Sequence, residues 1–498
     1  MGFFSNDGCI SKANGVETAF LILYFSILAA LSVHGLHILW LVFHRLRHSR
    51  IPDPPPALRN DANLPAVTVQ LPLYNEKAVV ARLLGAVTSM EYPRDRLHIQ
   101  VLDDSTDETA EMAKTEVERY RTEGFSVDWI HRENRTGFKA GALQNGMERD
   151  RHGELVAIFD ADFVPNPDFL LRVVPCFKDP KVGMTQVRWG HLNEEKSLLT
   201  RLQSLFLDGH FVMESETRDR AGLFLTFNGT AGVWRRTCIE DAGGWQSDTL
   251  TEDLDLSYRA QLAGWKFRFL NECVTPAELP ASVEAFKSQQ SRWTRGAAET
   301  LLKLGRRVLT ADIPWKAKLE VFFHLTSHLV FPALVVLALC AYPALRIRLE
   351  GSPWKLVCVD LPLYILGVFS VNWFYVWGQR VLYPDNWRRI FRIPGLLFLG
   401  TGLAVSNTLA VVQAYRKTPG RFARTPKAGD HARSPYTSAK SQSTWIEIGL
   451  ALYLSLCIFH ALQIHLWASI PFLLVFAAGF GGIGFLSLWE RRFSWRSV

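Results

Sequence analysis

The sequence contains no C-x-x-C pair, and its seven cysteines are scattered over 498 residues. Closely paired cysteines are the usual sign of a zinc site, and dense sets of cysteines in a short chain indicate a disulfide framework. Neither kind of site is therefore expected. Cys340, Cys358 and Cys457 lie in or beside apolar segments, where cysteine commonly serves as a small packing residue.

Charged residues are also few. They make up 21% of the chain, whereas apolar residues make up 48% and aromatic residues 12%, a composition that excludes a disordered protein. The mean hydropathy of +0.05 is typical of a water-soluble domain joined to membrane spans. The net charge of +7 would suit nucleic acid, but the basic residues cluster beside apolar segments, as they do in the cytoplasmic flanks of membrane proteins. We therefore expect a lipid bilayer, and no nucleic acid, as a partner.

The apolar segment at residues 17–43 is longer than the about 20 residues that cross a bilayer, and it is too long for the core of a signal peptide. The arginine-rich segment that follows places the next domain in the cytoplasm and the N-terminus outside. A stiff proline-rich linker comes after it. We therefore expect an N-terminal transmembrane helix at 1–50, a cytosolic domain at 51–300 and a membrane domain at 301–498.

Short apolar runs alternate with helical patterns in the cytosolic part, which predicts a doubly wound α/β domain. The runs lie at residues 67–71, 98–102, 125–131 and 155–159. Two of them end directly in aspartates, namely Asp103, Asp104, Asp160 and Asp162. Because parallel sheets bind ligands beyond the carboxyl ends of their strands, we expect these side chains to gather at one edge of the sheet.

Asp160 and Asp162 are one residue apart at the end of the fourth run. Residues i and i+2 of an extended segment project to the same side, so both carboxylates could face one divalent cation. Hard oxygen ligands suit Mg2+ or Mn2+, and the usual cargo of such an ion is a diphosphate. The alternative is a solvated Asp-x-Asp turn, because the motif is short.

Further motifs add a cation, a small-residue turn and more acids. Lys139 lies in a cation-rich stretch at a helix start, where an anion is favoured. The segment 227–232 reads as a turn of small residues whose backbone amides could approach a ligand closely. Glu252 and Asp253 precede a helical stretch at 254–263, and the alternative to a site there is helix capping.

Gln289, Arg292 and Trp293 combine an amide, a guanidinium and an indole within five positions. A guanidinium pairs well with diphosphate oxygens, and an indole offers a flat apolar face to a sugar ring. This set therefore suits recognition of a sugar diphosphate. The alternative is an ordinary interfacial anchor, since an arginine beside a tryptophan is common where a chain meets a membrane.

The order and the residues of these motifs resemble those of membrane-embedded, processive glycosyltransferases of family 2. This group includes the cellulose synthases and, more closely, the plant mannan and xyloglucan-backbone synthases of the cellulose-synthase-like group. The resemblance covers the chain from about Val67 onward. Its motifs are Asp103-Asp104-Ser105, Asp160-Ala161-Asp162, Thr251-Glu252-Asp253, Gln289-x-x-Arg292-Trp293, and the mannan-synthase-like stretches 135–141 and 227–232. It implies a GT-A-type cytosolic domain and a helical transmembrane bundle in a plasma, inner or Golgi-type membrane.

The resemblance also implies how a nucleotide-sugar donor is held. Asp103 or Asp104 would contact the base and ribose of the nucleotide. Asp160 and Asp162 would hold the diphosphate, Asp162 through the metal ion. Lys139 would neutralise phosphate charge or order the acids.

For the transfer step, the resemblance makes Asp253, beside Glu252, the general base. Gln289, Arg292 and Trp293 would bracket the diphosphate and the acceptor sugar. Joining sugars with inversion requires a carboxylate that takes the proton of the acceptor hydroxyl, while a metal and an arginine stabilise the charge on the leaving nucleoside diphosphate. Only one base is needed, so no covalent intermediate is implied.

Four further apolar segments are predicted to span the membrane, at residues 322–342, 356–377, 445–466 and 470–489. His324 and His328 share a face of the first of these and could line a polysaccharide path. The alternative is that both are satisfied hydrogen-bonding groups between helices.

The segment 392–413 is apolar but rich in glycine and in small polar residues, so we expect an interfacial helix rather than a span. With that placement the basic loop at 420–430 faces the cytoplasm. The loop resembles the F-x-V-T-x-K gating loop of cellulose synthases at Phe422, Thr425 and Lys427, whereas Arg424 stands where those enzymes have valine. The alternative is an ordinary basic flank of the membrane.

The expected function is therefore polymerisation of a β-linked glucan, mannan or glucomannan from a nucleotide sugar, with export of the product through the enzyme's own spans. GDP-mannose and UDP-glucose both remain open as donors, with a lean toward a glucan or glucomannan product, and the growing glycan is the acceptor. An accessory export subunit is allowed for. The alternatives are a non-processive transferase that glycosylates one lipid, such as ceramide or diacylglycerol, and a transporter or scaffold whose domain merely binds nucleotide.

Overall fold

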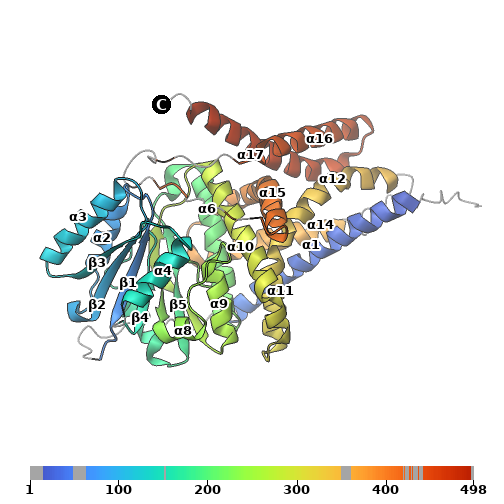
Figure 1. Ribbon diagram of the computed structural model, residues 1–498. Coiled ribbons are helices and arrows are strands. Elements are labelled where there is room, and N and C mark those ends of the chain that lie inside the picture. Colours follow the sequence, from blue (N-terminus) through green and yellow to red (C-terminus); the bar gives the residue numbers. More distant parts are fainter. Residues whose placement is uncertain are drawn as a thin grey trace, which may run out of the picture.

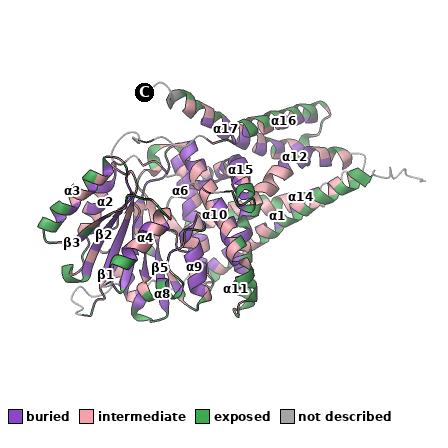
Figure 2. Cartoon of the chain, viewed as in Figure 1, coloured by how far each residue is buried: buried purple, intermediate pink, exposed green. Residues whose placement is uncertain are grey.

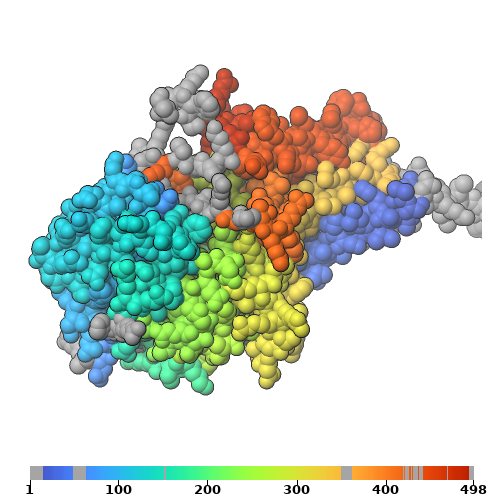
Figure 3. All heavy atoms as spheres, viewed as in Figure 1, coloured from blue at the N-terminus to red at the C-terminus, as the bar shows by residue number. Residues whose placement is uncertain are grey.

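The computed structural model describes residues 15–48, 63–150, 153–348, 361–418, 420, 425–427, 429, 436 and 441–494. A sheet flanked by helices occupies one side of the molecule, and long helices from both ends of the chain lie together on the other side (Figure 1). The space-filling view shows the same two parts as a rounded body and an elongated pack of helices (Figure 3). This arrangement confirms the expected α/β domain joined to a helical bundle.

The α/β domain is built on a seven-stranded sheet with the order β3-β2-β1-β4-β6-β5-β7. The first four strands coincide with the four predicted runs, whereas the last three were not predicted. The strands are β1 (Val67–Leu73), β2 (Leu97–Asp103), β3 (Ser126–His131), β4 (Leu155–Ile158), β5 (Val182–His191), β6 (Gly232–Arg235) and β7 (Lys266–Ala277).

The sheet is mixed, which corrects the expectation that β4 lies within a parallel sheet. β4 runs parallel to β1 but antiparallel to β6, and β6 is also antiparallel to β5. The apolar run of β4 reflects burial of both faces, because Val156, Ala157 and Ile158 are all fully buried. Helices that cover both faces produce such a run whatever the direction of the neighbouring strand.

Helices cover both faces of the sheet, and the side chains of each strand alternate between them. The face that Val69 and Leu71 of β1 contact carries α2 (Val80–Thr88), α3 (Thr109–Thr122) and α5 (Phe169–Val173). The opposite face carries α4 (Phe138–Arg149), α8 (Arg236–Asp241) and α9 (Glu252–Leu262). Gln70 points to this second face, and its amide donates to the Leu143 carbonyl of α4.

The remaining helices join the sheet domain to the membrane part. Two of them, α6 (Leu198–Gly209) and α7 (Glu216–Arg220), follow β5, and a short π-helix separates them. The long helices are α1 (Gly15–Arg47), α10 (Val283–Thr310), α11 (Trp315–Thr326), α12 (Val330–Arg348), α14 (Leu361–Leu382), α15 (Ile393–Tyr415), α16 (Thr444–Gln463) and α17 (Ile470–Ser494). α15 lies at the centre of this part, since it contacts α10, α12 and α17.

Within the described residues, five helical segments are long and apolar enough to cross a membrane. They are Gly15–Arg47, Trp315–Arg348, Trp387–Tyr415, Thr444–Gln463 and Ile470–Arg492. Their outer faces expose large apolar side chains, as Figure 2 shows along α1 and α16. Leu456 of α16, for example, is 69% exposed. Lipid is the solvent that such surfaces require, and the chain is therefore a membrane protein.

Four of these segments contain predicted spans. The remaining one, Trp387–Tyr415, contains the helix predicted to lie in the interface, and 61% of its apolar window is buried against the rest of the protein. Length and composition do not separate the two placements, so the interfacial placement stays a prediction. The predicted span at 356–377 lies partly outside the described residues, and α14 is not among the five segments.

Two details differ from the expectations. Helix α10 runs across the boundary expected at residue 300. The helix expected at 322–342 is interrupted by a 3-10 turn between α11 and α12, which places His324 and His328 on different elements. The Tyr258 hydroxyl pairs with His324 at 2.6 Å, and the Tyr415 hydroxyl pairs with His328 at 3.3 Å. These contacts favour structural hydrogen bonding over a channel lining.

Candidate active site

A pocket opens at the carboxyl edge of the sheet, where β1, β2 and β4 end. Parallel neighbouring strands end at the same edge, so residues that follow them in sequence meet there. The lining includes eleven predicted site residues: Asp104, Lys139, Asp160, Asp162, Glu252, Asp253, Gln289, Arg292, Trp293, Thr425 and Lys427. Residues widely separated in the chain are thus brought together in one cavity.

Lys139 orders Asp160 at one wall of the pocket. It lies in the first turn of α4, after Gly137, whose φ of 73° starts the helix sharply. Its ammonium donates to the Asp160 carboxylate at 2.5 Å and to the Gly229 carbonyl at 2.7 Å. Burial alone would lower the pKa of Lys139, but the carboxylates of Asp160 and Glu252 outweigh it and raise the pKa. The lysine is therefore a fixed positive charge.

Asp162 pairs with a lysine from a distant part of the chain. The Lys427 ammonium donates to its carboxylate at 2.6 Å, and the Glu278 amide donates to the same oxygen at 3.2 Å. Asp162 is 2% exposed. Burial raises the pKa of Asp162, and the charge of Lys427 opposes this rise. The ammonium of Lys427 therefore lies beside Asp162, where the sequence predicted a divalent metal cation.

Asp160 and Asp162 offer the carboxylate oxygens that hard divalent cations prefer. Across the described parts of the chain, no group of three or more histidine, cysteine, aspartate or glutamate side chains is arranged to hold a metal ion. A closed protein cage is therefore not indicated among these residues. Mg2+ and similar ions are usually held by one or two carboxylates together with substrate phosphates. Asp160 and Asp162, both lining the pocket, fit a metal ion of that kind.

Asp253 lies in the first turn of α9 and faces Gly229. Its Oδ1 accepts the amide of Leu254 at 2.8 Å. A Cβ atom on Gly229 would lie 2.9 Å from its Oδ2, and the φ of Gly229 is 82°, so this position requires glycine. Burial, together with repulsion from Glu252, raises the pKa of Asp253 to about 7, although Lys139 and Arg292 act in the opposite direction.

The expected alternative of helix capping describes only part of what Asp253 does. Thr251, at the N-cap position of α9, makes no side-chain capping bond, and Asp253 binds one backbone amide of the first turn. The same carboxylate lines the pocket beside Glu252. A buried carboxyl with a raised pKa in a cleft is the usual setting of a general base.

Of the two neighbouring aspartates at the end of β2, only Asp104 lines the pocket. The Arg132 guanidinium holds it through two hydrogen bonds, of 2.7 and 2.5 Å. Asp103 is fully buried and accepts hydrogen bonds from the Ser105 amide, at 2.9 Å, and from two side chains of β3, those of Trp129 and His131. Its contacts hold the strand ends together, and it is not among the lining residues.

Gln289, Arg292 and Trp293 reach the pocket from α10. Their spacing of three and four residues places them on one face of the helix. The start of α10 is fixed by Ser282, whose hydroxyl accepts the Ala285 amide at 3.2 Å, and by Glu490 of α17, which accepts the Val283 amide at 2.7 Å. The membrane part thus holds the helix that carries this motif.

The loop predicted to resemble a gating loop reaches the pocket through Thr425 and Lys427. The Thr425 hydroxyl is buried and has no hydrogen-bond partner among the described residues. The Gly429 amide donates to the Glu278 carboxylate at 3.0 Å, which holds the loop against the sheet domain. Phe422 lies outside the described residues.

Several lining residues were not among the predicted site residues, although Arg135 lies in the motif stretch 135–141. Tyr74 and Arg135 form a stack in which the guanidinium carbon lies 3.4 Å from the ring centroid. Trp189, His191 and Glu278 follow or end strands β5 and β7, which were not predicted. Tyr74 could have been found, because it lies three residues after the run predicted at 67–71, much as Asp104 lies two residues after the run at 98–102.

The fold was compared with solved structures. A mannosyltransferase from Pyrobaculum calidifontis, solved in complex with GDP-Man and Mn2+, matches with a TM-score of 0.55 at 20% identity, over 80% of this chain and 100% of that one. The mixed sheet, the pocket at its carboxyl edge and this likeness define a glycosyltransferase fold of the GT-A type.

Sequence relatives are more specific. The profile described as "Glycosyltransferase like family 2" matches residues 65–296. Probable glucomannan 4-beta-mannosyltransferase 9 of Oryza sativa subsp. japonica is 36% identical over 81% of this chain and 78% of its own length. The chain belongs to the family 2 glycosyltransferases, with cellulose-synthase-like relatives.

Two further relatives match over a shorter part. Glucomannan 4-beta-mannosyltransferase 1 of Oryza sativa subsp. japonica is 40% identical over 66% of this chain and 64% of its own length. Glucomannan 4-beta-mannosyltransferase 2 of Arabidopsis thaliana is 45% identical over 49% of this chain and 46% of its own length. The chain thus spans less than two thirds of the length of either protein.

Proposed function

We propose that the protein is a membrane-embedded, inverting glycosyltransferase that extends a β-1,4-linked mannan or glucomannan and passes it through its membrane helices. The observation that carries this proposal is the placement of Asp253, the paired acids Asp160 and Asp162, and the α10 motif in one pocket beside the membrane part. The catalytic domain faces the cytoplasm, where the nucleotide sugar is available.

GDP-mannose is the proposed donor. The sequence leaves GDP-mannose and UDP-glucose open, but the relatives are named as glucomannan mannosyltransferases and the similar fold was solved with GDP-Man and Mn2+. The flat stack of Tyr74 and Arg135, next to Asp104, offers a platform and a carboxylate for the base and ribose.

Asp160 and Asp162 would hold a divalent cation of the Mg2+ or Mn2+ type, which when bound supplies positive charge to the diphosphate. Lys139 keeps Asp160 oriented. Arg292 adds a further positive charge at the pocket, where the charge of the leaving nucleoside diphosphate develops.

Asp253 would take the proton from the acceptor hydroxyl as that oxygen attacks the anomeric carbon of the donor sugar. The bond from this carbon to the diphosphate breaks, and the diphosphate leaves with the electron pair. Glu252 assists by raising the pKa of its neighbour toward the working pH. One base and one direct displacement invert the anomeric centre without a covalent enzyme intermediate.

This assignment predicts the pH dependence of transfer. Because the pKa of Asp253 is raised from 3.8 to about 7, the carboxyl is protonated and inactive as a base below that pH. We expect kcat/KM to rise about tenfold per pH unit below pH 7 and to level off above it. By the same shift, the contribution of this group to folding stability falls between pH 4 and pH 7, since the folded state binds the proton more tightly. A rate that is independent of pH from 5.5 to 8 would contradict the assignment.

Lys427 is expected to matter for turnover rather than folding. Its ion pair with Asp162 holds the ammonium at the pocket, where it would pair with the diphosphate of the donor. We expect Lys427→Ala to lower kcat about tenfold or more, with a melting temperature close to that of the parent. Lys316→Ala, an exposed lysine at the start of α11, is the matched control and should leave kcat unchanged. If Lys427→Ala kept the parental kcat, the loop at 420–430 would have no role in catalysis.

The proposed function is tested by incubating the purified protein with labelled GDP-mannose and, separately, UDP-glucose. We expect incorporation from GDP-mannose into a product that an endo-β-1,4-mannanase digests. If sugar were incorporated from UDP-glucose alone, UDP-glucose and not GDP-mannose would be the donor. Transfer from neither donor would overturn the proposal.

A further inference from the structure

His191 stands in the pocket on the side away from the proposed nucleotide platform. It ends β5, whereas Asp104 follows β2, and β4 with its two acids lies between them in the sheet. Both His191 and Asp104 line the same cavity. A nucleotide on the β1 and β2 side, with its diphosphate at the tip of β4, leaves the β5 side of the cavity for the acceptor.

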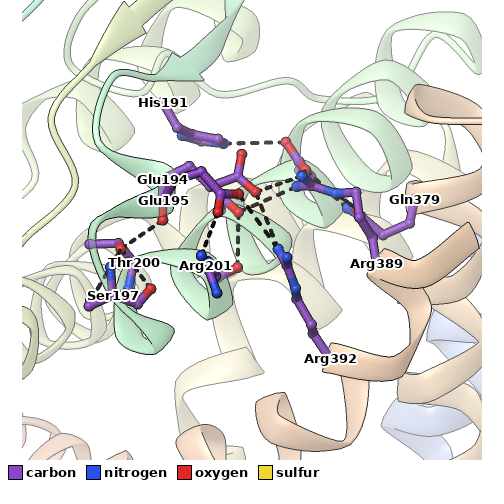
Figure 4. A network of polar contacts seen from close by, with 11 residues as sticks. His191, Glu194, Glu195, Ser197, Thr200, Arg201, Gln379, Arg389 and Arg392 are labelled. Atoms are coloured by element: carbon purple, nitrogen blue, oxygen red, sulfur yellow. Dashed lines mark hydrogen bonds and ion pairs between the residues drawn. The ribbon is translucent and has the colours of Figure 1, made fainter. Parts of the chain in front are cut away.

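A buried polar network holds His191 (Figure 4). Its Nε2 pairs with the carboxylate of Asp208, in α6, at 3.3 Å. The other oxygen of Asp208 accepts from the Gln379 amide of α14 at 3.0 Å and from the Arg389 guanidinium at 3.3 Å. Arg389 also donates to Glu194 at 2.6 Å. The network therefore runs from the pocket wall into the helices of the membrane part.

The network determines which ring nitrogen of His191 is available to a ligand. Asp208 is fully buried, which alone would raise its pKa, but its contacts with His191, Gln379 and Arg389 outweigh burial and lower the pKa, so the carboxyl is ionised. A carboxylate only accepts, so the hydrogen on Nε2 faces Asp208, and in the neutral imidazole Nδ1 then keeps its lone pair. Within the described part of the chain, the hydrogen-bond partner of the His191 ring is Asp208. Nδ1 is thus an acceptor suited to a sugar hydroxyl.

The surroundings of His191 also suit a sugar. Trp189, two residues earlier on β5, and Trp293 of α10 line the same cavity and offer flat apolar faces. An acceptor nitrogen beside two aromatic rings suits a hydroxyl-rich sugar ring.

We propose that His191 is an acceptor-binding residue, which accepts a hydrogen bond at Nδ1 from a hydroxyl of the acceptor glycan. Asp208 is its positioning residue, and Gln379 and Arg389 tie this subsite to the membrane part that the glycan enters next. The inference rests on the proposed function and adds the residues that recognise the acceptor.

The test is the acceptor KM of His191→Phe, with β-1,4-mannotetraose as acceptor and saturating donor. Phenylalanine fills a similar volume but accepts no hydrogen bond. Loss of one hydrogen bond predicts an acceptor KM about tenfold higher, with the donor KM unchanged. The unchanged donor KM also reports that the variant is folded. His98→Phe, at the opposite end of β2, is the matched control and should match the parent.

Asp208→Asn tests the positioning role. It should raise the acceptor KM in the same direction, and in the double variant with His191→Phe it should add no further rise, because Asp208 acts through His191. An acceptor KM of the parental value in His191→Phe, or a raised donor KM instead, would overturn the inference while leaving the proposed function intact. If the parent protein transferred sugar from neither GDP-mannose nor UDP-glucose, the inference and the proposed function would fail together.

Discussion

Replacing Asp253 with asparagine is expected to lower the rate of sugar transfer about 10³-fold, within the range that removal of a general base produces. Donor affinity should stay within about twofold of the parent, because the diphosphate contacts proposed here belong to other residues. The reason is chemical, since an amide cannot take the proton of the acceptor hydroxyl. Turnover is measured by the release of nucleoside diphosphate, and donor affinity is measured by calorimetry. The two measurements separate the effect on transfer from the effect on binding.

Asparagine is a good test because it caps a helix as well as aspartate does. If the carboxylate served only the first turn of α9, through the Leu254 amide, the variant would keep the parental rate. Asp241→Asn, at the exposed end of α8, is the matched control and should change neither quantity. A near-parental rate for Asp253→Asn would show that the base lies elsewhere.

Replacing Asp162 with alanine is expected to weaken donor binding about 100-fold, and chelation of divalent ions should have a similar effect on the parent. The carboxylate would hold the cation against the diphosphate. Its removal also leaves the partly buried Lys427 without this ion-pair partner. Donor affinity should be measured by calorimetry with added Mn2+ and with a chelator.

Asp160→Ala should have a smaller effect, because Lys139 remains as a positive charge beside the diphosphate. In the Asp162 variant, the chelator should cause little further loss. If the chelator leaves the donor affinity of the parent unchanged, a metal ion takes no part in donor binding.

The strand-tip acids were predictable because a buried strand leaves a local signature. Residues 155–159 form an unbroken apolar run, and Asp160 follows it at once. The strands β5 to β7 carry weaker signatures. β6 is four residues long, and β5 contains polar Gln186, which is nevertheless fully buried because its amide donates to the Ala231 carbonyl.

Contacts between distant segments could not be predicted from local pattern. Lys427 and Asp162 are 265 residues apart, so no local pattern connects them. The same holds for His191, because its partner Asp208 is also held by Gln379 and Arg389 from a distant part of the chain. Membrane spans, by contrast, follow from length and hydropathy, although the break between α11 and α12 was not visible in either.

The most direct test of a processive membrane synthase is the size and location of the product made by the protein in sealed vesicles. Labelled GDP-mannose is supplied to the side that carries the catalytic domain, and the product is sized before and after digestion from outside with endo-β-1,4-mannanase. The proposed function predicts a long polymer that resists the enzyme until the vesicles are opened. A single mannose attached to a lipid, or a polymer released on the donor side, would contradict it.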